Sequence, residues 1–193
     1  VHRVPAKQVS QLRTNLYVFS GSDRVLIDGN MVQFDRNYSN SIDMFDAVKI
    51  GNNGENLGIS RNGELLVVDR RMPVQQTDTI FFNTGKLRIK QYQLEVMPQK
   101  MAQEGLEAYL EDRYMQTLTS ISLHDTTRVS FNVVNVPGSY ATDRFRLLFR
   151  NTTKTQNPAF ETGKSETARN AEQESSEVIR QHQQTEASIT VYP

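Results

Sequence analysis

The sequence predicts an all-β domain over residues 10–150, an antiparallel β-sandwich of the jelly-roll kind. Short apolar runs alternate with turn signals throughout this range, and several runs alternate apolar and polar residues with a period of two. A single polar face of this kind is typical of an antiparallel sheet that is half exposed to water. Strand and helix patterns do not alternate, which argues against a parallel sheet. We therefore expect about eight or nine short strands in a sandwich or jelly roll.

Two glycine-containing turns mark the first strands. Asp28-Gly29 separates two apolar runs within residues 24–34, and Asn62-Gly63 separates residues 57–59 from residues 65–68. Glycine accepts the positive φ that tight hairpin turns require. Each pair therefore predicts a β-hairpin.

The later strands show the clearest alternation. The residues expected on the inward face are Tyr92, Leu94 and Val96, then Val129, Phe131 and Val133, and finally Phe145, Leu147 and Phe149, with Leu148 as an exception. The parity of the pattern changes before Tyr92, which predicts a bulge or a sharp bend at Lys90-Gln91. A helical turn is expected around Leu106–Leu110.

The composition excludes several kinds of partner and several kinds of chemistry. Lys+Arg and Asp+Glu both number 22, so a neutral chain is not expected to bind nucleic acid. No apolar run approaches the roughly 18 residues that span a bilayer, so we expect no membrane-spanning segment. The chain has no cysteine, which excludes thiol nucleophiles, Cys-ligated zinc, iron–sulfur clusters and disulfides.

Polar composition also predicts the organisation outside the sandwich. Residues 1–9 form an N-terminal lead-in. Residues 151–188 are rich in Thr, Gln, Glu, Ser and Asn, and too poor in apolar residues to offset the entropy of folding. We expect them to form a polar linker that is disordered on its own. Residues 189–193 then look like the start of a further module.

The sequence contains no recognisable set of catalytic residues. His124, in His124-Asp125, lies in an expected hairpin turn, and His2 and His182 lie near the chain ends. Neither a nucleophile elbow nor a metal-ligand spacing accompanies them. A carboxylate pair of the glycosidase kind is conceivable in an acidic group made of Glu107, Glu111 and Asp112. We expect no enzymatic activity, and a hydrolase remains the weakest alternative.

Two binding sites are conceivable. Asp43, Asp46 and Glu55 lie in an oxygen-rich region that calcium could use, although turn and cap hydrogen bonds explain the same residues. No other cofactor is expected. Four tyrosines near expected loops or strand ends could stack on sugars, or else cover the edges of the core: Tyr38, Tyr109, Tyr114 and Tyr140. A carbohydrate- or surface-polymer-binding module is therefore the second hypothesis.

Three separate stretches of the sequence, taken together and in this order, resemble a known family. They are Tyr38–Lys49, then Gly54–Gly58 continuing to Val68–Arg71, and Gly138–Phe149. The region 10–150 resembles the penultimate module of large secreted surface proteins of Bacteroidetes-type bacteria. In that family a polar linker follows, and then a C-terminal type IX secretion sorting domain. The opening of that domain is similar to Ile189, Thr190, Val191, Tyr192 and Pro193.

The resemblance implies a non-catalytic, adhesin-like structural module with a defined export route. The parent protein would cross the inner membrane and periplasm, and then leave through the outer-membrane type IX translocon to be secreted or held at the cell surface. Its partners would be translocon components and the neighbouring domains of the parent, with the linker presenting the sorting domain. The matched residues have a structural interpretation as well: Asp43 and Asp46 cap a loop, and Asp143 caps a turn and pairs with Arg144.

Overall fold

The computed structural model describes residues 9–152, which form an all-β fold, as the sequence predicts. The fold has eleven strands, more than the eight or nine expected, and one short 3₁₀ helix, η1. In chain order the elements are β1 (Ser10–Ser20), β2 (Asp23–Phe34), β3 (Ala47–Val48), β4 (Asn56–Arg61), β5 (Glu64–Arg71), β6 (Thr79–Gly85), β7 (Gln91–Gln99), β8 (Leu106–Asp112), β9 (Thr117–Ile121), β10 (Thr127–Asn132), η1 (Pro137–Tyr140) and β11 (Phe145–Asn151).

The expected linker and terminal segment lie outside the described residues. Of the linker, the structure describes only Asn151 and Thr152, and it describes neither residues 189–193 nor the lead-in before Val9. His2 and His182 also lie outside. Within residues 9–152 no helix is long and apolar enough to cross a membrane.

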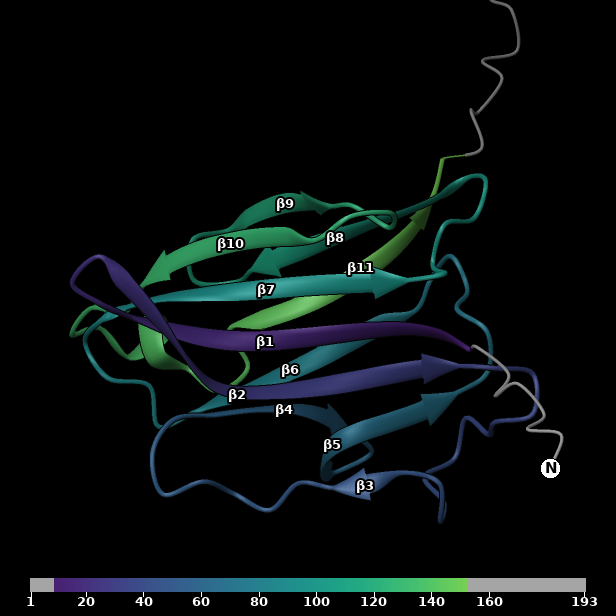
Figure 1. The fold of residues 1–193 in the computed structure, drawn as a ribbon, viewed down its shortest axis with the longest axis horizontal. Helices are drawn as coiled ribbons and strands as arrows, with labels where there is room; N and C mark the ends of the chain where they lie inside the picture. Colours follow the sequence, from purple (N-terminus) through teal and green to yellow (C-terminus); the bar gives the residue numbers. More distant parts are fainter. Residues whose placement is uncertain (1–8, 153–193) are drawn as a thin grey trace, which may run out of the picture. The chain divides into compact units, whose positions relative to one another are not determined.

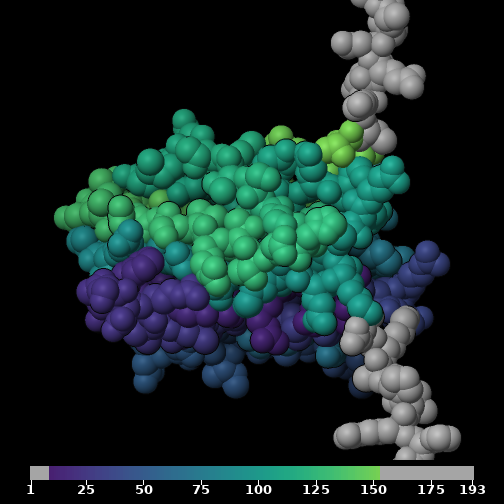
Figure 2. All heavy atoms as spheres, turned by 45° about the horizontal axis from the view of Figure 1, so that its top comes forward, coloured from purple at the N-terminus to yellow at the C-terminus, as the bar shows by residue number. Residues whose placement is uncertain are grey.

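The strands form one sheet that curls into a nearly closed barrel or sandwich (Figure 1). The strand order is β10-β7-β1-β2-β5-β4-β6-β11-β8-β9, with β3 paired to β5 beside this path. All pairs are antiparallel except β2 with β5. The two edges of the sheet, β9 and β10, follow each other in the chain. Figure 2 shows the teal and green second half of the sequence beside the purple N-terminal strands.

The core consists of the inward-facing residues of the alternating strands. Tyr92, Leu94 and Val96 are fully buried, which confirms the inward face predicted for β7. The ring of Phe131 stacks on Tyr92 with 5.6 Å between ring centroids, and it meets Phe145 edge-on at 4.7 Å. Aromatic contacts therefore join β10 to its neighbour β7 and also to β11, which is not its neighbour in the sheet.

The hairpin predicted at Asp28-Gly29 is wrong, because both residues lie inside β2. The chain turns earlier, at Gly21, whose φ is +63°. Asp28 lies instead at a bulge, where the pairing with β1 shifts register. Its carboxylate accepts a hydrogen bond from the backbone N–H of Leu57 at 2.6 Å and pairs with Lys49 at 2.7 Å. Asp28 makes these long-range contacts, and they override the preference of an Asp-Gly pair for a turn.

One further local prediction needs correction, and two are confirmed. Residues 106–110 belong to strand β8 rather than a helical turn, and Gly105, at φ +73°, turns the chain just before it. Lys90 lies in a bend between β6 and β7, and Gln91 begins β7, so the sharp bend offered as one of two explanations for the change of parity is confirmed. Asn62-Gly63 does form the predicted β4–β5 turn, with φ values of 48° and 85°.

The first and last strands lie inside the sheet and not at its edges. β1 pairs with both β2 and β7, and β11 pairs with both β6 and β8. The Ser10 hydroxyl donates to the carbonyl oxygen of Lys100 at 2.7 Å, and the Thr152 N–H donates to that of Gly105 at 2.8 Å. Both ends of the domain are therefore held by the connection between β7 and β8.

Candidate functional site

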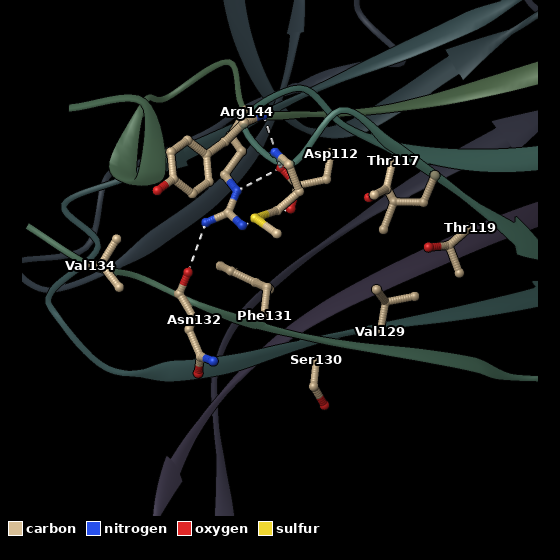
Figure 3. A pocket seen from close by; sticks show the side chains of 12 residues that line it. Asp112, Thr117, Thr119, Val129, Ser130, Phe131, Asn132, Val134 and Arg144 are labelled. Atoms are coloured by element: carbon tan, nitrogen blue, oxygen red, sulfur yellow. Dashed lines mark hydrogen bonds and ion pairs between the residues drawn. The ribbon is translucent and has the colours of Figure 1, made fainter. Parts of the chain in front are cut away.

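A pocket of about 410 Å³ lies between the two edge strands of the sheet. β9 contributes Thr117 and Thr119, and β10 contributes residues 129–132. Figure 3 shows the two threonines above Val129, with Arg144 and Asp112 joined at one end of the pocket. We call this the seam pocket. Its lining combines apolar core residues with hydroxyl groups, a composition common in ligand-binding pockets.

Arg144 closes the inner end of the seam pocket and is only 2% exposed. Its Nε and Nη2 donate to the two carboxylate oxygens of Asp112 at 2.9 and 2.6 Å. Its Nη1 donates to the carbonyl oxygens of Asn132 at 3.0 Å and Ser139 at 2.8 Å. The guanidinium carbon also lies within about 5 Å of the ring centroids of Tyr114, Phe131 and Phe145.

One buried arginine therefore joins β8, the end of β10, η1 and the start of β11. The prediction that Arg144 pairs with its neighbour Asp143 is wrong. Asp143 instead binds Arg113, at the protein surface. Neighbouring residues at the start of a strand point in different directions, so each one meets a partner from a distant part of the chain.

The acidic group around β8 does not form a carboxylate pair. Asp112 binds Arg144, and it also caps the following turn through the backbone N–H of Tyr114 at 3.0 Å. Glu111 forms an ion pair with Arg146 of β11, and this hydrogen bond holds the pKa of Glu111 below its ordinary value. Glu107 accepts a hydrogen bond from the hydroxyl of Tyr109 at 2.6 Å, which raises the pKa of that tyrosine.

The structure separates the four tyrosines proposed as a sugar platform. Tyr38 lies beside the guanidinium of Arg70, and Tyr109 beside that of Arg150. Tyr140, 41% exposed, ends η1. Of the four, Tyr114 is the one that lines the seam pocket. The tyrosines therefore mostly flank arginines instead of sharing one surface.

The residues proposed for calcium likewise take separate roles. Asp43 Oδ1 accepts the N–H of Phe45 at 2.8 Å, and Asp46 Oδ2 accepts the N–H of Asp43 at 2.9 Å. Asp46 Oδ1 also accepts the N–H of Arg70 at 2.7 Å, so both aspartates cap the loop before β3. Glu55 binds elsewhere, and residues 9–152 contain no group of three or more His, Asp or Glu side chains that could hold a metal ion.

His124 takes no part in these clusters. It is exposed in the turn between β9 and β10, as expected, and its backbone N–H donates to the Ser122 hydroxyl at 3.2 Å.

Glu55 belongs to a cluster with Tyr92, which is buried like Glu55, and with Arg88, which is exposed. The sequence did not single out this cluster. Oε1 of Glu55 accepts the Tyr92 hydroxyl at 3.1 Å and its Oε2 accepts Arg88 Nη2 at 3.1 Å. Burial alone would raise the pKa of Glu55, but its own backbone N–H, Arg88 and Tyr92 together hold it below the ordinary value. Burial raises the pKa of Tyr92. Tyr92 could have pointed to this cluster in the sequence, because a tyrosine on a buried face needs a hydrogen-bond partner.

We expect the Glu55 cluster to make the fold sensitive to acid. A carboxyl whose pKa is lower in the folded state stabilises that state above about pH 4.3, the ordinary glutamate value. This stabilisation is lost as the pH falls through the depressed pKa. Urea unfolding at pH 7 and pH 3 should therefore show a smaller acid-induced loss of stability for Glu55→Gln than for the wild type.

The matched control for that measurement is Glu64→Gln, which changes an exposed carboxylate at the start of β5. It should lose as much stability on acidification as the wild type does. An equal loss for all three proteins would contradict the role assigned to Glu55.

Comparisons with protein-family models, with curated proteins and with solved structures find no match to this chain.

Proposed function

We propose that this chain carries a non-catalytic structural module of a secreted or cell-surface protein. One observation carries the proposal: each of the four buried carboxylates within residues 9–152 is paired with an arginine. The pairs are Glu55 with Arg88, Asp69 with Arg61 and Arg71, Glu95 with Arg24 and Arg128, and Asp112 with Arg144. The buried charges thus connect separate parts of the sheet.

The direction of the pKa shifts supports a structural role for these groups. A general acid at neutral pH needs a pKa raised toward the working pH. The pKa of Glu95 is instead lowered: burial opposes this, but hydrogen bonds from Arg128, Tyr17 and Arg24 prevail. The pKa values of Glu55 and Glu111 are lowered as well. These carboxylates are stabilised in the ionised form, which suits a permanent ion pair.

The residues that carry the family resemblance are also the structural ones. Asp69 and Arg71 lie in the second resembling stretch, and Arg144 lies in the third. Asp46, in the first stretch, holds the loop before β3 against β5 through the backbone of Arg70. A module similar in sequence at these positions would share this internal scaffold, which supports applying the family's structural role to this chain.

The export route in this proposal is the type IX translocon. It rests on the resemblance of residues 10–150 and of Ile189–Pro193 to secreted proteins that use this route. The linker would present the sorting domain to the translocon, and neighbouring domains of the parent would be the module's other partners.

Export is tested in the bacterium that encodes the chain, by comparing strains with and without a working type IX translocon. Antibodies against residues 10–150 should detect the parent protein at the surface or in the medium of the first strain, and in the periplasm of the second. A periplasmic marker protein controls for leakage. Equal surface amounts in both strains would contradict the export route.

A further inference from the structure

A second pocket, of about 550 Å³, lies at the ends of β4 and β5 and beside β6. Three arginines line it, Arg61, Arg71 and Arg113, together with Asp143 and Phe81. We call it the arginine pocket. Its size is within the range of roughly 300–1,000 Å³ found for small-molecule sites.

The arginine pocket carries more positive than negative charge. Arg61 and Arg71 share one fully buried carboxylate, that of Asp69, and Arg113 pairs with Asp143. Three guanidinium groups thus face two carboxylates. Within residues 9–152, Nε and Nη2 of Arg113 and Nη1 of Arg71 donate no hydrogen bond. These N–H groups are available to an anion.

The Arg113–Asp143 pair can open to admit a ligand. Its side chains are 50% and 71% exposed. Ion pairs at such exposure contribute little to stability. A carboxylate or sulfate from a ligand can therefore take the place of Asp143 on the planar guanidinium at little cost, and the two-pronged geometry of arginine suits both anions.

Phe81 adds an apolar surface to the arginine pocket. It points outward from β6 and is 50% exposed, while its neighbours Ile80 and Phe82 are buried. Ser60, Asn62 and Asn83 also line the pocket, and their side chains make no hydrogen bond within residues 9–152. An aromatic ring beside free amide and hydroxyl groups suits a sugar, which presents a C–H face and hydroxyl groups.

We propose that the arginine pocket binds an acidic saccharide, a polysaccharide unit that bears a carboxylate or sulfate. Arg113 binds the acid group, Phe81 stacks against the sugar ring, and the amides of Asn62 and Asn83 bind hydroxyl groups. This activity goes beyond the structural role proposed above, and its failure would leave that role untouched. Because the attraction is partly between exposed charges, binding weakens as the salt concentration rises.

The test is an NMR titration of the purified, ¹⁵N-labelled chain, residues 1–193. The probes are oligogalacturonate, sulfated dextran oligomers, neutral dextran oligomers and sodium sulfate. Both acidic saccharides should shift the amide signals of β6 and of the residues around Arg113, and neutral dextran should not. Loss of the charged hydrogen bonds in Arg113→Gln should weaken binding about tenfold or more, and Phe81→Ser should weaken it as well.

The matched control is Arg128→Gln, which removes the same charge from another exposed, ion-paired arginine, on β10. It should leave the affinity within about twofold of the wild type, since exposed charges far from the ligand are screened. Near-ultraviolet circular dichroism checks that each variant is folded. The proposal is overturned if no acidic saccharide binds, if Arg128→Gln weakens binding as much as Arg113→Gln, or if neutral dextran binds equally well. Sulfate ion shifting the same signals as strongly as the oligomers would also overturn it, in favour of a site for free anions.

Discussion

Replacing Arg144 with alanine should lower the free energy of unfolding by about 3–5 kcal/mol, the usual cost of breaking a buried ion pair. The variant leaves the Asp112 carboxylate without its cation and the carbonyl oxygens of Asn132 and Ser139 without their donor. It also opens a gap among the rings around the guanidinium. Urea denaturation followed by circular dichroism measures the loss.

Arg113→Ala is the matched control for this experiment. It removes an arginine whose carboxylate partner is exposed, so it should cost about 0–1 kcal/mol. Arg144→Lys keeps the charge but cannot reproduce the two parallel bonds to Asp112, so its stability should lie between those of the wild type and the alanine variant. If Arg144→Ala costs no more than Arg113→Ala, the structural role of this residue is refuted.

The second large effect is expected at Asp69, which is completely buried between two arginines. Asp69→Asn keeps the shape of the side chain but leaves the nearly buried guanidinium groups of Arg61 and Arg71 without a counter-charge. The expected cost is again about 3–5 kcal/mol. Arg61 also donates to the carbonyl oxygen of Asn40, so the loop before β3 should loosen as well. Amide hydrogen exchange around residue 40 should therefore become faster.

Asp143→Asn serves as the control, because it makes the same chemical change at an exposed ion pair. It should change stability by about 0–1 kcal/mol and leave exchange around residue 40 unchanged. If Asp69→Asn behaves like Asp143→Asn, the paired arginines are not held by Asp69 in the way described.

The sequence predicted the fold class because alternation of period two is a local property. Tyr92, Leu94 and Val96 are buried on the same side of a strand whichever strands lie next to it. The hairpin predicted at Asp28-Gly29 was wrong for the opposite reason, because the position of Asp28 depends on a distant contact. The Asp28 carboxylate binds the backbone N–H of Leu57, 29 residues away, and no local sequence pattern predicts this contact.

Neither pocket could be predicted from the sequence, and the physical reason is the same. Both are defined by which strands become neighbours. The seam pocket exists because β9 and β10 end the sheet, and the arginine pocket because Arg113 comes near the end of β4 and near β6. Arg144 was noticed in a resembling stretch, yet its partner, Asp112, lies 32 residues away. Only the strand order brings the two together.

The interior position of β11 sets the order in which the sheet can be completed. This last strand fills the space between β6 and β8 and brings the buried side chains of Phe145, Leu147 and Phe149 with it. A chain emerging from the ribosome must therefore expose nearly all of the domain before its final strand is available. Until then β6 and β8 cannot be bridged, so the sheet stays incomplete and leaves apolar surface exposed that chaperones can engage.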